Sequence, residues 1–147
     1  MMKDHFKTLF EHEYWANTKI LATIMTAEQC PAKVIELFSH VIATQRIWLD
    51  RINGDTSEVK VWEVFEKEIM LELLEINFTD IIKTIDNQDI NQLITYQSSK
   101  GEQYTRTVKQ ILTHLTLHAT YHRGQVVLLL KPHVEVLPST DYIFFVT

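Results

Sequence analysis

The sequence predicts an all-α protein, a four-helix bundle with a short β-hairpin or loop before the last helix. Apolar residues recur at helical spacing in four stretches of about 20 or more residues. The 147 residues include only three glycines and three prolines, so little interrupts long helices. Amphipathic helices of this length can bury their apolar stripes against each other, and we expect residues 1–147 to form a single domain.

The first three helices are predicted from this periodicity and from the breaks between them. The first is expected over residues 3–25, and Pro31 suits the first turn of the second, which Asn53-Gly54 ends. The third is expected to begin after the capping residues Asp55-Thr56-Ser57, with Phe78-Thr79-Asp80 as a point at which it could be interrupted.

The last third of the chain contains a hairpin, a fourth helix and an apolar tail. Between residues 91 and 107 apolar and polar side chains alternate, and Gly101 is placed for the turn of a β-hairpin. The fourth helix is expected over residues 107–130 and is stopped by Lys131-Pro132. The tail, residues 138–147, is too apolar to remain in water, so we expect it to pack on the bundle or on another subunit.

Composition argues against several classes of protein. The net charge is −5, whereas binding to a phosphate backbone requires a basic face, so nucleic acid is not an expected partner. The single cysteine, Cys30, cannot form an intrachain disulfide. The N-terminus lacks a signal-peptide pattern, and no run approaches the roughly 20 apolar residues that span a bilayer. We therefore expect a cytoplasmic protein with no membrane partner.

Two histidines on the fourth helix are the most informative residues. His118 and His122 are one helical turn apart and lie, by their spacing, close to the centre line of its apolar stripe. Two neighbouring imidazoles on a buried face are costly unless their nitrogens are satisfied. A metal ion satisfies both, as in the two-histidine helix motifs of zinc enzymes. This pattern predicts a metal site.

A third ligand is expected from another helix, because two ligands rarely hold an ion tightly. His40 is the best candidate, since it lies on the inward side of the second helix, and His114, at the edge of the stripe, is its rival. A lone histidine on an apolar face is more often a core residue with one hydrogen bond. The other histidines are expected at surface or terminal positions: His5, His12 and His133.

Neighbouring residues have ordinary interpretations beside functional ones. Arg123 could bind a substrate anion, but a charge on the helix surface is the commoner role. Gly124 is costly inside a helix and indicates close helix approach or space beside the site. Some helix carboxylates could approach the metal, although most such charges are solvated. These are Glu11, Glu13 and Glu63.

Four groups of residues carry a resemblance to a known family. They are Tyr14-Trp15-Ala16-Asn17; Phe38-Ser39-His40 with Trp48; His118 with Tyr121-His122-Arg123-Gly124-Gln125; and, in the tail, Pro138, Asp141, Ile143, Phe144 and Phe145. The HRGQ stretch, which begins at the second histidine of the i, i+4 pair, is the most specific of these. On these residues the sequence resembles the DinB family over nearly the whole chain.

The resemblance implies an up-down-down-up arrangement of the four helices, often as a homodimer. It also implies a three-histidine metal site, which falls on His40, His118 and His122, with zinc or nickel as the ion. Some members resemble transferases or isomerases that use a low-molecular-weight thiol, and others resemble metal-dependent hydrolases. The family name reflects DNA-damage-inducible expression and does not indicate polymerase activity.

Three neutral imidazoles would leave a divalent ion with its full charge and an open position, which can activate water or a thiol. The leading hypothesis is therefore a metal-dependent enzyme acting on a small molecule, either thiol S-transferase-like or hydrolase-like. The alternative is a non-catalytic, metal-binding or dimerising helical bundle, induced by stress or DNA damage. A third hypothesis, nucleic-acid binding, rests on the family name alone, and the negative charge argues against it.

Overall fold

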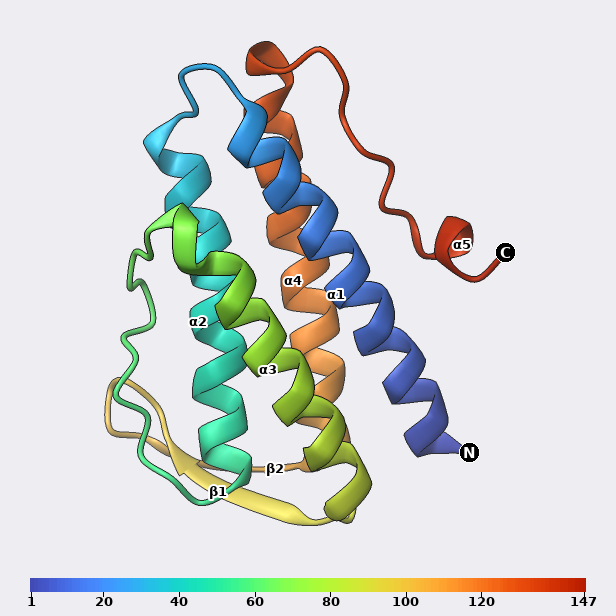
Figure 1. Cartoon of the computed structure of the whole chain (residues 1–147). Helices are drawn as coiled ribbons and strands as arrows, with labels where there is room; N and C mark the ends of the chain where they lie inside the picture. Colours follow the sequence, from blue (N-terminus) through green and yellow to red (C-terminus); the bar gives the residue numbers. More distant parts are fainter.

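The computed structural model describes all residues, 1–147, as a mostly helical chain with one small antiparallel sheet (Figure 1). The long helices are α1 (Met2–Thr26), α2 (Ala32–Ile52), α3 (Lys67–Asn87) and α4 (Val108–Leu130). The hairpin strands are β1 (Leu93–Gln97) and β2 (Gln103–Thr107), followed after α4 by η1 (Lys131–His133) and α5 (Tyr142–Phe145). A largely helical fold with a hairpin before the last long helix is thus confirmed.

The four long helices pack side by side. In Figure 1, α1 and α4 run toward one end of the molecule, and α2 and α3 run in the opposite direction. Helices α1 and α2 each contact both α3 and α4, while β1 contacts α2 and β2 contacts α4. The hairpin therefore lies against the α2–α4 pair, near the end where α2 stops and α4 begins. No helix combines the length and the apolar character that crossing a membrane requires.

Apolar side chains form two separate core clusters. The cluster at the hairpin end includes Phe10 of α1, Leu49 of α2, Ile81 of α3 and Ile111 of α4. The cluster at the other end is built in the same way, from Ile20, Phe38, Leu74 and Val126. Burial of each such side chain stabilises the fold by about 1.5–3 kcal/mol.

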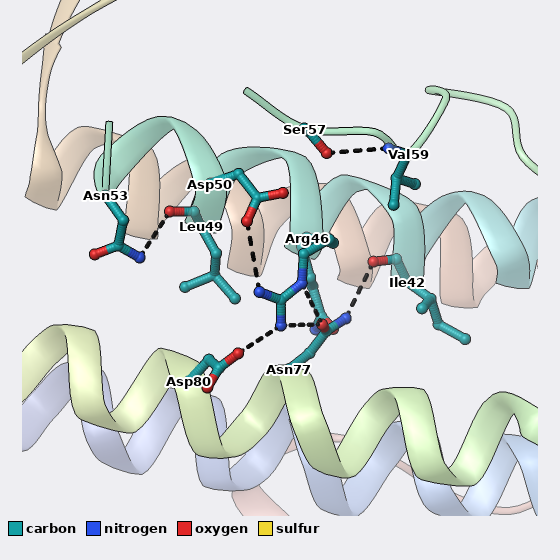
Figure 2. Close-up of polar contacts among 10 residues, drawn as sticks. Ile42, Arg46, Leu49, Asp50, Asn53, Ser57, Val59, Asn77 and Asp80 are labelled. Atoms are coloured by element: carbon teal, nitrogen blue, oxygen red, sulfur yellow. Dashed lines mark hydrogen bonds and ion pairs between the residues drawn. The ribbon is translucent and has the colours of Figure 1, made fainter. Parts of the chain in front are cut away.

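A layer of polar side chains separates the two clusters, and Arg46 is its centre between α2 and α3. Figure 2 shows the Arg46 guanidinium between Asp50 and Asp80 and beside Asn77. Arg46 donates to Asn77 Oδ1 (2.9 and 3.2 Å) and to Asp80 Oδ2 (2.7 Å). The Asn77 amide in turn donates to the backbone oxygen of Ile42 (3.2 Å). These contacts fix the rotation of α2 against α3.

The same layer continues to α1 and α4. Asn77 donates to Gln45 Oε1 (3.2 Å), and Gln45 donates to Glu13 Oε2 (2.8 Å). The other Glu13 oxygen lies 3.8 Å from Arg123 Nη1, which also donates to Asn17 Oδ1 (3.1 Å). Both members of the Glu13–Arg123 pair are buried, with relative side-chain exposures of 3% and 5%. One polar network therefore connects all four long helices.

The third helix begins later than the sequence predicts. Residues 53–66 form a loop rather than helix, so the prediction that Asp55-Thr56-Ser57 caps α3 is wrong. Side chains of α2 hold this loop, because Ser39 Oγ accepts from the Phe65 amide (3.0 Å). The expected interruption at Phe78-Thr79-Asp80 is absent, and α3 continues through these residues.

The C-terminal tail packs on α1, as one of the two predicted alternatives requires. His12 Nε2 lies 2.7 Å from the Thr140 carbonyl oxygen, and the ring centroids of Phe145 and Trp15 are 5.5 Å apart. His12 is therefore buried, and the expectation that it is a surface residue is wrong. The spacing of α1 gave no indication of the tail that covers it.

Candidate metal centre

Adjacent helices bring the three predicted histidines together. His40 comes from α2, and His118 and His122 come from α4. One ring nitrogen from each can be chosen so that all three lie within 4.8 Å of one another. No other group of three or more histidine, cysteine or acidic side chains in the chain is arranged to hold an ion.

The position of the pair on α4 differs from the predicted one. The buried stripe of α4 passes through Leu115, Ala119 and Val126, and His118 and His122 are half-buried beside it. The placement on the centre line is therefore wrong. The two imidazoles lie at the edge of the stripe, and His118 lines a cavity there that a small molecule can enter.

Hydrogen bonds orient two of the three rings. His40 Nδ1 lies 2.7 Å from the Val61 carbonyl oxygen, which can only accept, so this nitrogen carries the proton. His122 Nδ1 lies 2.7 Å from Gln125 Oε1 and donates to it in the same way. In each neutral ring Nε2 is left with a lone pair. Such partners on the non-ligating nitrogen are typical of histidines that bind metals.

The spacing of the nitrogens fits a divalent ion. His118 Nε2 and His40 Nε2 are 3.0 Å apart. Zinc–nitrogen bonds are about 2.0–2.1 Å long, so two nitrogens on one tetrahedral zinc lie about 3.3 Å apart. Without an ion, His118 donates its proton to the free lone pair of His40. For both Nε2 atoms to bind an ion, the His118 proton would sit on Nδ1 instead, and the two atoms would need to move apart by only a few tenths of an ångström.

Burial favours the neutral form of two of the rings, those of His118 and His40. Burial, followed by the charges that its three histidine neighbours would carry, lowers the pKa of His118 from 6.5 to about 3. Burial also lowers the pKa of His40, although its hydrogen bond to Val61 acts in the opposite direction. Neutral imidazole is the form that binds a metal, so neither of these side chains has to release a proton to solvent when it binds near neutral pH.

We expect acid to destabilise the metal-free protein through His118. Unfolded, this ring takes up a proton as the pH falls through 6.5, whereas the folded protein resists protonation down to about pH 3. Its contribution to stability is therefore present above pH 6.5 and is lost on acidification. Urea unfolding at pH 7, 5 and 4 should show a greater loss for the wild type than for His118→Asn. Parallel losses in both proteins would contradict this assignment.

Trp62 belongs to the site although the sequence gave no sign of it. Its ring stacks on His40 with centroids 3.8 Å apart and planes within 9°. The residue lies in the loop between α2 and α3, next to Val61, whose carbonyl oxygen accepts the hydrogen bond from His40. The loop therefore fixes His40 both by stacking and by a hydrogen bond.

A cavity of about 420 Å³ opens beside the histidines. His40 and His118 line it, together with side chains from the hairpin end of α2 and from the hairpin itself. His114 lines it as well, with its ring 5.6 Å from that of His118, but it is not one of the three grouped nitrogen donors. The cavity has the size of a small-molecule site.

Several other candidates lie apart from the three histidines. Arg123 is buried and paired with Glu13, so the expectation of a surface charge is wrong. A Cβ added at Gly124 would meet no atom within 4 Å, which rules out close helix approach and leaves open space. None of the acidic candidates joins the group: Glu11, Glu13 and Glu63.

Comparison with known proteins identifies the family. The model of the DinB family matches residues 2–146. This chain belongs to the DinB family. Among similar proteins, Protein DinB of Bacillus subtilis (strain 168) is 22% identical over 162 aligned residues, which cover 96% of this chain and 93% of that protein. No solved structure gives a significant match. The DinB resemblance inferred from the sequence motifs is thus confirmed.

Proposed function

We propose that this DinB-family protein is a divalent-metal-dependent enzyme in which His40, His118 and His122 hold one ion, zinc or nickel. The observation that carries the proposal is the convergence of the three rings beside a cavity that His40 and His118 line. Two of the rings are already held in the tautomer that leaves Nε2 free to bind. A merely structural role for these histidines would not require a cavity beside them.

The number of protein ligands indicates the kind of chemistry that the ion would support. A divalent ion bound by three neutral imidazoles keeps an open position and lowers the pKa of a small thiol or a water there. We infer a thiol S-transferase-like or hydrolase-like reaction on a small molecule that enters the cavity. Val61 and Gln125 keep the His40 and His122 rings in place, and Trp62 excludes water from one face of His40.

We also infer that the four long helices form the up-down-down-up bundle that the family resemblance implies. The opposite directions of the α1–α4 and α2–α3 pairs in Figure 1 and the contacts of α1 and α2 with both other long helices support it. A homodimer would provide cover for apolar side chains that α4 exposes. They are Leu117, Tyr121, Leu128 and Leu129.

Metal content and turnover together test the proposed function. Tag-free protein is incubated with zinc or nickel, dialysed and analysed for metal, and we expect about one ion per chain. The loaded protein is then assayed for transfer of a small thiol to chlorodinitrobenzene and for hydrolysis of nitrophenyl esters, with metal-free protein as the control. A bound ion without any metal-dependent rate would instead favour the non-catalytic bundle. Failure to bind either ion would rule out the proposed site.

A further inference from the structure

The cavity beside the histidines has a basic and aromatic wall. Trp48 and Arg51 of α2 and Tyr96 and Arg106 of the hairpin line it, while no aspartate or glutamate does. This composition is unexpected in a chain of net charge −5. The wall therefore concentrates positive charge beside the proposed metal position.

The arginines of the chain divide into two kinds. There are four, and Arg46 and Arg123 each form an ion pair with a carboxylate in the polar layer. Arg51 and Arg106 form no ion pair, and both line the cavity. Each guanidinium donates one hydrogen bond to a backbone oxygen, from Arg51 to Gln97 (3.3 Å) and from Arg106 to Thr105 (2.7 Å). Since a guanidinium has five N–H donors, most remain available.

Two aromatic rings hold the Arg51 guanidinium in place by cation–π contacts. Its central carbon lies 4.4 Å from the Trp48 ring centroid and 4.8 Å from that of Tyr96. The two aromatic rings are themselves packed edge to face at 4.8 Å. Contacts of this kind restrain the guanidinium between the two rings without using its N–H groups as hydrogen-bond donors. A planar fork of donors restrained at this position suits an acceptor with two oxygens.

We infer that the cavity binds a small organic anion whose carboxylate or phosphate group contacts Arg51 and Arg106. The rest of the molecule lies against Trp48 and Tyr96 and extends toward His40 and His118. The inference rests on the proposed function in one respect, that the bound anion is the substrate whose other end reaches the metal. The anion pocket itself needs no metal, because its charges come from the two arginines.

Three probes of similar shape separate charge from stacking. Benzoate, phenyl phosphate and neutral benzamide are titrated into metal-free and zinc-loaded protein at low salt, and amide chemical shifts are followed by NMR. We expect at least one anion to bind about tenfold or more tightly than benzamide in both forms, because charge-assisted hydrogen bonds are the stronger kind. A preference for phenyl phosphate over benzoate would assign the phosphate class, and the reverse would assign the carboxylate class.

Substitutions locate the charge that is responsible. Arg51→Gln and Arg106→Gln should each reduce the preference for the anion about tenfold, and Arg51→Lys should retain part of it, because lysine keeps the charge without the fork. Lys109→Gln is the matched control, since it removes the same charge from an exposed position outside the cavity. The amide spectrum of each variant reports whether it is folded.

The outcomes for the pocket and for the metal site are distinguishable. Equal affinity for benzoate, phenyl phosphate and benzamide in a protein that loads one ion would overturn the anion pocket and leave the proposed function intact. A preference for the anion in a protein that binds no ion would support the pocket and remove its link to metal chemistry. A preference that survives in the combined Arg51→Gln/Arg106→Gln variant would also overturn the inference.

Discussion

Zinc affinity is expected to fall about 100- to 4,000-fold when alanine replaces any one of His40, His118 or His122. Binding free energies of zinc in protein sites reach about 10–16 kcal/mol, so one of three protein ligands contributes on the order of 3–5 kcal/mol. Each 1.4 kcal/mol corresponds to about a tenfold change in affinity. Competition against a chromophoric chelator at pH 7.5 measures the change directly.

Two further variants make this prediction specific. His114→Ala should leave zinc affinity unchanged, because His114 lines the same cavity without joining the grouped nitrogens. Gln125→Ala should weaken binding less than loss of a ligand does, by about 10- to 100-fold, because it removes only the acceptor that orients His122. If the loss at His114 is as large as that at His118, the third ligand is His114 of α4, and its assignment to His40 of α2 is wrong.

The fold could be predicted wherever a boundary depends on local chemistry. Pro31 precedes α2, and Gly54, with φ of +78°, follows its end. Thr107 caps α4 through a capping box with Gln110, which fixes that boundary within the sequence itself. The predicted start of α3 was wrong because the backbone of Val61 and of Phe65, in the loop before α3, bonds to side chains of α2. Such competition cannot be read from a local pattern.

The site, too, has residues that local spacing predicts and residues that it does not. The four-residue spacing of His118 and His122 places them on one face of α4 without any knowledge of the fold, and His40 was found because its helix has an inward side. Trp62 and the partner of Arg123 were not predictable, since each depends on a chain segment distant in sequence. Arg123 looked like an exposed charge because nothing near it in the sequence shows that Glu13 of α1 lies opposite.

Loss of the Arg123 side chain is expected to cost about 3–5 kcal/mol in the free energy of unfolding, as for other broken buried ion pairs. In Arg123→Met the Glu13 carboxyl stays buried without its cation, and Asn17 Oδ1 loses its donor. Urea unfolding of the metal-free protein at pH 8 measures the cost. The double variant Glu13→Leu/Arg123→Met should recover much of it, because it removes both charges and keeps apolar volume.

The pH dependence of this loss distinguishes an unpaired carboxylate from a simple packing defect. Burial raises the pKa of Glu13 from 4.5 to about 7 even though Arg123 acts to lower it. Without Arg123 the pKa should rise further, so the folded variant must retain a proton that the unfolded chain releases above pH 4.5. The stability of Arg123→Met should therefore decline as the pH increases, and its deficit should be larger at pH 8 than at pH 5. An equal deficit at both values would show that lost packing, rather than the charge of Glu13, explains the effect.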